Sequence, residues 1–258
     1  MINIKKKFSI SMSRTHMIMI SFLAVILAGT LLLMLPISTK TGETTTIKGA
    51  LFTSTSAACV TGLVVYDTWT HWTLFGQLVI LTEIQIGGLG FITIGMFAMI
   101  MLCQKIGLGS RELIHESLST LGIKGSVRLV RRIVFGTLIF EGIGALILSC
   151  RFIPEMGVKT GIYYGIFHSI SAFCNAGFDL MGYKEPYSSF TSYVSDPIVN
   201  IVIMALIIIG GIGFIVWEDV LVNKWRIKKY RFQSKIVLLT PAVLLVGGTL
   251  LFLIAEND

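Results

Sequence analysis

The chain has 258 residues, of which 54% are hydrophobic and 14% are charged, and its mean hydropathy is +0.82. A soluble domain carries about 25% charged residues, so this composition excludes an ordinary soluble domain. It predicts an all-α integral membrane protein, and the formal net charge of +7 has to be explained within that class.

Apolar runs of about 18 residues or more indicate membrane-spanning helices. Five segments are expected to span the membrane, namely residues 17–35, 73–103, 133–150, 197–217 and 236–254. The first has an apolar core of 19 residues, longer than the roughly 7–15 residues usual in a signal peptide, and no A-x-A cleavage site follows it. We therefore expect a retained first helix.

Basic residues gather on one side of the membrane if the five segments cross it in turn. Sixteen of the 21 lysines and arginines lie before the first span, between the second and third, or before the fifth. Loops rich in these residues stay in the cytoplasm, so we expect a multi-pass protein of the cytoplasmic membrane with a cytoplasmic N-terminus. The positive charge then reflects topology, and no basic stripe with interleaved aromatics indicates nucleic-acid binding.

One polar stretch between two apolar segments occurs twice. Residues 53–65 read TSTSAACVTGLVV, and residues 168–180, 115 positions later, read HSISAFCNAGFDL. Five of the thirteen positions are identical, where average residue frequencies give roughly one match. A second pair, GGLGFI at 87–92 and GGIGFI at 210–215, recurs at an offset of 123. We therefore predict two tandem copies of one unit in the same orientation.

The first polar stretch is too short to cross the membrane. A helix over residues 47–58 rises 1.5 Å per residue and is about 18 Å long, which is little more than half of a hydrocarbon core of about 30 Å. The chain must then turn back without helical structure, and such backbone is tolerated at membrane depth only inside protein or along a water-filled cavity. We expect a re-entrant pore helix and an extended return segment in each copy.

Backbone carbonyls of the two return segments are the candidate cation ligands, because carbonyl oxygens can replace the hydration shell of K⁺. A glycine near the centre of each segment relieves the steric limits on the backbone. The candidate residues are Cys59, Val60, Thr61, Gly62 and Leu63 in filter 1, and Cys174, Asn175, Ala176, Gly177 and Phe178 in filter 2. The alternative is an ordinary extracellular loop that makes a small-residue helix contact, and the second copy favours the pore.

The order of a span, TSTSAACVTGLVVYDTW and then TEIQIGGLGFITIG resembles the Trk/Ktr/HKT cation-transporter superfamily. It is most similar to the N-terminal portion of the bacterial Ktr potassium-uptake membrane subunits (KtrB-type). The resemblance implies tandem membrane–pore–membrane repeats with a K⁺-channel-like fold, in which Gly62 and Gly177 match the filter glycines. It also implies K⁺ as the substrate, Na⁺ as a coupling or activating ion, a homodimer, and a cytoplasmic nucleotide-binding regulatory ring (KtrA/KtrC-type).

The repeats predict a division of the chain. We expect a first repeat at 1–104, a cytoplasmic linker at 105–131, a second repeat at 132–222, a basic cytoplasmic loop at 223–235, and the first helix of an incomplete third repeat at 236–258. The family has four filters around its pore, and this sequence holds two. We therefore expect either a fragment or truncated product, or two chains that together complete a pore.

Four acidic side chains are further candidates. Asp67 and Asp179 follow the filters and are candidate pore-mouth charges that concentrate cations, with solvated loop acids as the alternative. Glu83 and Glu141 lie within predicted spans, where acids usually face a cavity or a partner. One interpretation of this pair is a pore-vestibule or ion-coupling charge, and the other, which we favour, is a structural hydrogen bond or ion pair between helices.

Three function classes remain. We predict potassium translocation across the cytoplasmic membrane through a filter of backbone carbonyls, either passive or Na⁺-dependent. The alternative is a non-conducting assembly or regulatory membrane subunit. A membrane enzyme is the weakest reading, because the four cysteines and four histidines show no metal-ligand spacing and no nucleophile lies beside a base. We expect no enzymatic activity, no covalently bound cofactor, and no metal other than K⁺ at the filter.

Overall fold

The computed structural model describes residues 14–90, 126–223 and 226–256, and its regular elements there are helical apart from one β-bridge between Thr39 and Trp72. The helices are α1 (Arg14–Leu33), α2 (Ile47–Ala58), α3 (Thr68–His71), α4 (Leu74–Leu89), α7 (Ser126–Met156), α8 (Val158–Phe173), α9 (Pro197–Gly211), α10 (Phe214–Asn223) and α11 (Phe232–Ala255). Short 3-10 turns connect them at Pro36–Ser38 (η1), Met181–Tyr183 (η2), Thr191–Tyr193 (η3) and Ile227–Lys229 (η4). Most of the predicted linker and the second half of the predicted span at 73–103 lie outside the described residues.

Polar caps define where several helices begin. Thr46 precedes α2, and Thr73 precedes α4; each side chain accepts a hydrogen bond from the backbone N–H three residues later. Asp196 caps α9 in a similar way, and that helix opens with a proline. An N-cap oxygen satisfies a backbone donor that the first turn leaves free. The helix predicted over residues 47–58 is therefore confirmed as α2, and its role in a pore stays a prediction.

Two described helices are long and apolar enough to span a membrane, the Val130–Met156 part of α7 and Phe232–Ala255. The bent pair α9 and α10 is a third span if it is counted as one, and α1 and α4 contain the shorter apolar helices Ile18–Leu33 and Leu74–Leu89. The predicted all-helical, apolar architecture is confirmed. The count of five spans stays a prediction.

The predicted span at 197–217 is not one straight helix. Its two halves, α9 and α10, meet at an angle of 91°. Gly213 lies between them with φ +86°, a left-handed conformation that ends helices and that glycine adopts without a steric penalty. The indole Nε1 of Trp217 donates to the carbonyl of Ile209 at 3.1 Å and so satisfies an acceptor near the break.

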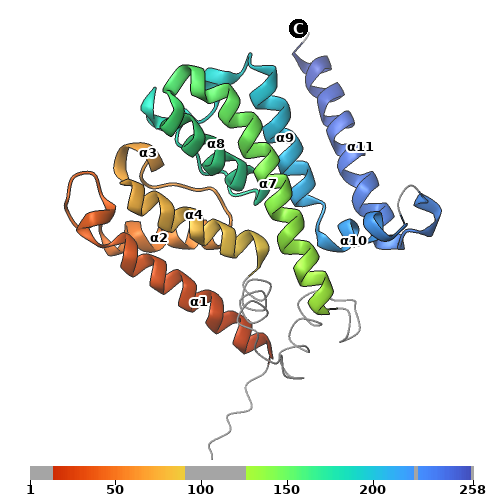
Figure 1. Cartoon of the computed structure of the whole chain (residues 1–258), viewed down its shortest axis with the longest axis horizontal. Helices are drawn as coiled ribbons and strands as arrows, with labels where there is room; N and C mark the ends of the chain where they lie inside the picture. Colours follow the sequence, from red (N-terminus) through yellow and green to blue (C-terminus); the bar gives the residue numbers. More distant parts are fainter. Residues whose placement is uncertain (1–13, 91–125, 224–225, 257–258) are drawn as a thin grey trace, which may run out of the picture.

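Two groups of three helices pack side by side (Figure 1). In the first group α1, α2 and α4 contact one another, and in the second group α7, α8 and α9 do the same. The groups meet where α4 contacts α8. The helix α11 contacts α10 and otherwise stands apart, with its apolar side chains exposed.

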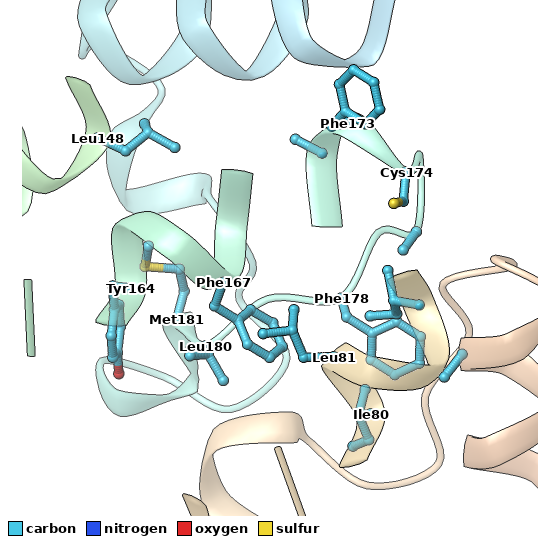
Figure 2. Packing of buried hydrophobic residues seen from close by; sticks show 14 of the residues in the cluster. Ile80, Leu81, Leu148, Tyr164, Phe167, Phe173, Cys174, Phe178, Leu180 and Met181 are labelled. Atoms are coloured by element: carbon cyan, nitrogen blue, oxygen red, sulfur yellow. The ribbon is translucent and has the colours of Figure 1, made fainter. Parts of the chain in front are cut away.

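The hydrophobic core lies at this junction of the two groups. Figure 2 shows Ile80 and Leu81 of α4 gathered with Phe167 of α8 and with Phe178, which follows α8. Ile80 and Phe167 are fully buried, and Phe178 is 2% exposed. Phe178 belongs to predicted filter 2, so the hydrophobic core fixes the position of that segment.

Candidate cation-filter site

The two predicted filters follow their short helices with the same backbone conformation. Filter 1 (residues 59–63) leaves the end of α2, and filter 2 (residues 174–178) leaves the end of α8. Val60 and Asn175 occupy the same position, with φ +56° and +59°. Two residues later Gly62 and Gly177 have φ +75° and +74°. The sequence offset of 115 therefore pairs residues with matching backbone geometry.

Hydrogen bonds at the two helix ends also match. In each copy, the second residue after the C-cap donates its backbone N–H to a serine carbonyl five residues earlier. These bonds are Thr61 N to Ser56 O at 2.9 Å and Ala176 N to Ser171 O at 2.8 Å. Such bonds satisfy carbonyls that the last helical turn leaves free. Val60 and Asn175, which lie between the C-cap and the donating residue, are thereby held in the left-handed region.

The two filter glycines lie against each other. A Cβ placed on Gly62 would be 2.6 Å from the carbonyl oxygen of Ala176 and 3.2 Å from Cα of Gly177. A Cβ on Gly177 would be 3.3 Å from Cα of Gly62. Segments 115 residues apart thus bring their backbones together at one place, and a side chain at Gly62 would clash with filter 2.

The return segments are not helical and lack backbone partners. In the described part of the chain, residues 62–65 make no backbone–backbone hydrogen bond, and neither do residues 177–180. Two carbonyls in these stretches accept side-chain hydrogen bonds: Val65 O accepts from the hydroxyl of Tyr187, and Phe178 O from that of Ser171. Carbonyls without such partners are available to other donors or cations, as predicted for a return segment.

The Gly-Gly motifs let the long helices approach the short ones. A Cβ on Gly87 of α4 would overlap the carbonyl oxygen of Ala58, the last residue of α2. A Cβ on Gly210 of α9 would overlap the carbonyl oxygen of Phe173, the last residue of α8. Gly88 is packed against Cys174 of filter 2. The motif therefore places α4 against the start of both filters.

Serines of the short helices are anchored at equivalent places. Ser54 Oγ lies 2.8 Å from the carbonyl of Ile26 on α1, and Ser169 Oγ donates to the carbonyl of Glu141 on α7 at 2.7 Å. Both pairs are related by the offset of 115. Each short helix is thus tied to the long helix that precedes it.

His168 supports the exit of filter 2. It lies inside α8, ten residues after the helix begins at Val158. Its Nδ1 bonds the carbonyl of Tyr164 at 2.8 Å, and its Nε2 accepts from the backbone N–H of Leu180 at 3.0 Å. A carbonyl only accepts, so the hydrogen is on Nδ1 and the imidazole is neutral. No local sequence pattern indicated this contact, which spans twelve residues.

The candidate mouth acids differ in their surroundings. Asp67 is 6% exposed and caps α3 through the backbone N–H of Thr70 at 2.7 Å. Its second oxygen accepts from the backbone N–H of Tyr187 at 3.0 Å, which ties it to the second group. Asp179 is half-buried, and burial raises the pKa of its carboxyl. It lines a pocket of about 270 Å³ together with Gly177 and His168.

The two candidate acids within the helices are buried and hydrogen bonded. Glu141 is 5% exposed, and both of its oxygens accept from Nε2 of Gln85, at 3.0 and 3.2 Å. The Cys174 thiol lies 3.9 Å from the same carboxyl group. Glu83 is 3% exposed and bonds the hydroxyl of Ser54. These contacts favour the structural interpretation of both residues.

The cysteine in each filter does not belong to a cluster of side chains that could hold a metal ion in the described part of the chain. Among the described residues, no group of three or more His, Cys, Asp or Glu side chains is placed to bind one. The described cysteines Cys59, Cys150 and Cys174 are free thiols. Cation binding at this site would therefore rest on backbone carbonyls.

Known proteins share this sequence over nearly its whole length. Residues 3–254 match the family model TrkH, described as a cation transport protein. The potassium/sodium uptake protein NtpJ of Enterococcus hirae is 42% identical over 254 residues, which are 98% of this chain and 55% of that protein. The Ktr system potassium uptake protein B of Bacillus subtilis is 46% identical over 219 residues, 85% of this chain and 47% of that protein.

A third relative shows the same partial coverage. The Ktr system potassium uptake protein B of Vibrio alginolyticus is 42% identical over 245 residues, which are 94% of this chain and 52% of that protein. The chain thus spans about half the length of the curated relatives it matches. Together with the apolar helices, these matches show that the chain is a membrane protein and belongs to the TrkH family of cation transport proteins.

Proposed function

We propose that this chain forms part of a K⁺ uptake protein, with the backbone of filters 1 and 2 as half of its selectivity filter. The observation that supports this most strongly is the convergence of Gly62 and Gly177, each at φ near +75° and each two residues after a left-handed position. The printed names of the relatives, which are potassium or potassium/sodium uptake proteins, agree with this substrate.

The proposed mechanism replaces water by carbonyl oxygens. A cation that enters the filter loses part of its hydration shell, and carbonyl dipoles of the return segments take its place. The short helices α2 and α8 end at the filters, and the C-terminal end of a helix carries a partial negative charge that favours cations. Na⁺ acts in this proposal as a coupling or activating ion, and no enzymatic step is involved.

The proposed architecture is a set of membrane–pore–membrane repeats. The first group and the second group would each supply one repeat, within residues 1–104 and 132–222, and α11 would begin a third. Gly211 of α9 supports this view, because it corresponds to Gly88, which packs on the second filter. A Cβ on Gly211 would approach only the Asn175 amide, at 3.7 Å. Its neighbours Ile207 and Ile208 are 41% and 38% exposed, a face open to a third pore segment.

Partners follow from the same proposal. Two repeats close half of a four-sided pore, so further repeats or a second chain would complete it. We propose a homodimer that works with a cytoplasmic nucleotide-binding regulatory ring, as the resemblance to the Ktr potassium-uptake membrane subunits implies. Basic loops on the proposed cytoplasmic side, including residues 223–235, are the natural contact surface for such a ring.

The test is a serine at the filter centre. Gly62→Ser in the full-length transporter should lower the preference for K⁺ over Na⁺, measured as uptake into cells that lack other K⁺ transporters. Gly42→Ser is the matched control, because Gly42 has φ +74° and nothing within 4 Å of its Cβ position. A K⁺/Na⁺ ratio that Gly62→Ser leaves at the level of the control would overturn the filter assignment.

A further inference from the structure

A groove of about 410 Å³ runs between α1 and α4, away from the two filters. Apolar side chains line its walls, and the large ones at its opening are exposed, with Leu32 at 41%, Phe75 at 37% and Leu78 at 46%. The counterparts of these three side chains in the second group, Ile147, Ile198 and Ile201, are also exposed, at 42%, 48% and 62%, although the first group packs beside them. A neighbouring repeat therefore leaves this face uncovered, and an exposed apolar patch on a membrane protein is a surface for lipid. We infer that the groove opens toward lipid.

One acidic side chain lies in this apolar groove. Glu83 lines the groove, and its side chain is only 3% exposed. One carboxyl oxygen, Oε1, bonds the hydroxyl of Ser54. The other, Oε2, has no hydrogen-bond partner in the part of the chain that the structure describes. The only other polar side chain of the lining is Thr82, whose hydroxyl donates to the carbonyl of Leu78 at 2.8 Å.

An ionised carboxylate does not fit this place. Burying a charge without a partner costs several kcal/mol even after relaxation. At such a cost a carboxylate binds a proton and becomes neutral. Among the described residues, none of the ion pairs includes Glu83. Within the described parts of the chain, the Ser54 hydroxyl is the donor found at its two oxygens.

The hydrogen count around Ser54 is satisfied by a neutral acid. A serine hydroxyl has one hydrogen, while Ser54 Oγ lies within bonding distance of both Ile26 O and Glu83 Oε1. If Ser54 donates to Ile26, as Ser169 donates to the equivalent carbonyl, then Oε1 must carry a proton and donate to Ser54. If Ser54 instead donates to Oε1, its hydrogen satisfies that oxygen and Oε2 is left without a donor; a neutral acid would carry its proton on Oε2, which faces the groove.

The second group of helices shows that this slot accepts an uncharged side chain. Leu206 on α9 corresponds to Glu83 on α4, at the offset of 123. A Cβ on Gly144 would lie 2.7 Å from Cδ1 of Leu206 and 2.6 Å from the hydroxyl of Ser169. A Cβ on Gly29, the counterpart of Gly144, would meet the Glu83 carboxyl group and the Ser54 hydroxyl in the same way. A neutral carboxylic acid in place of leucine keeps this packing and adds one hydrogen bond.

We propose that Glu83 is a proton-binding site that is protonated at neutral pH, open to the lipid through the groove between α1 and α4, and a target for hydrophobic carbodiimides. In that reaction the acid proton moves to one carbodiimide nitrogen, while the carboxyl oxygen bonds the central carbon to give an O-acylisourea. Rearrangement to the N-acylurea leaves the carboxyl with the added mass of one carbodiimide. No oxidant or other reactant is needed.

The experiment treats the full-length transporter in membranes with dicyclohexylcarbodiimide at neutral pH and locates the adduct by peptide mass spectrometry. Glu141 is the internal control, since it is equally buried but both of its oxygens are occupied by Gln85. We expect labelling of Glu83 roughly tenfold above that of Glu141, as for an intramembrane acid reachable from lipid. A water-soluble carbodiimide should label neither residue.

Three results would overturn the proposal. The first is the absence of an adduct at Glu83 while other acids of the same sample react. The second is equal labelling of Glu83 and Glu141 by dicyclohexylcarbodiimide. The third is labelling of Glu83 by the water-soluble carbodiimide to the same extent as by dicyclohexylcarbodiimide. A second measurement does not depend on the reagent. The infrared difference spectrum between the unsubstituted protein and Glu83→Gln should contain the carbonyl band of a protonated acid that shifts in D₂O, and a carboxylate band in its place would contradict a neutral Glu83.

Discussion

The contact between α4 and the end of α2 predicts a measurable penalty for one added methyl group. In Gly87→Ala the new Cβ would lie 2.9 Å from the carbonyl carbon of Ala58, with the carbonyl oxygen closer still. Carbon atoms in contact are about 3.5 Å apart or more, so the carbon contact alone requires α4 to retreat from α2 by at least about 0.6 Å, and the overlap with the carbonyl oxygen requires more. Overpacking of this kind costs about 1–3 kcal/mol.

The matched control is Gly142→Ala in α7. Gly142 is also inside an apolar helix, and a Cβ there would have nothing within 4 Å. Both substitutions gain the better helix propensity of alanine, about 1 kcal/mol, so the difference between them isolates the clash. We expect Gly87→Ala to be less stable than Gly142→Ala by about 1–3 kcal/mol.

Thermal unfolding of the detergent-solubilised transporter, followed by tryptophan fluorescence, measures this difference. K⁺ and Na⁺ uptake by the same two variants should show weaker discrimination in Gly87→Ala only, because Ala58 directly precedes filter 1. Equal unfolding temperatures for the two variants would refute the packing role of the Gly-Gly motif. If Gly87→Ala lowers the unfolding temperature but keeps the normal preference for K⁺ over Na⁺, the Gly-Gly motif stabilises the packing without affecting the filter.

Three further substitutions probe individual side chains. Val60→Asn should stabilise the protein by about 1 kcal/mol, because a β-branched residue at φ +56° is strained and asparagine tolerates this conformation; a loss of thermal stability would contradict that strain. Asp67→Ala should cost about 1–2 kcal/mol through the lost cap and the lost bond to Tyr187, and chemical denaturation that shows no change would argue against it. A hydrogen bond to Glu155 raises the pKa of Lys184, so this pair stabilises the fold below the unfolded pKa of about 10.4 and loses its effect as the pH rises through the raised value. Both side chains are about a third exposed, so Lys184→Met should cost less than about 1 kcal/mol at pH 7, and a larger cost would point to further roles of Lys184.

Local patterns predicted the parts of the site that depend on neighbouring residues. The short helix at 47–58 was predicted from its length and from the need to turn back within the membrane, and the structure adds Thr46 as its N-cap. The unusual backbone of Gly62 and Gly177 follows from glycine at the same place in two copies. The repeat comparison was informative because an offset of 115 residues also relates the hydrogen bonds at both helix ends.

Contacts between distant segments could not be predicted in this way. Gln85 and Glu141 are 56 residues apart, and Asp67 and Tyr187 are 120 residues apart. Neither pair repeats with the sequence offsets, so each depends on how the two groups of helices dock. The 91° bend after α9 was also missed, because the glycines that allow it stand in an apolar run that reads as one continuous span. The candidate acids were recognised by type, but their partners became apparent only from the packing.

The position of a bound cation tests the central claim most directly. Crystals of the full-length transporter grown with Rb⁺, a K⁺ substitute with a strong anomalous signal, would locate the ion without any substitution. The account predicts an anomalous peak within carbonyl distance of Thr61 or Gly62 and of Ala176 or Gly177. A transporter that takes up Rb⁺ but shows its peaks only away from filters 1 and 2 would contradict it.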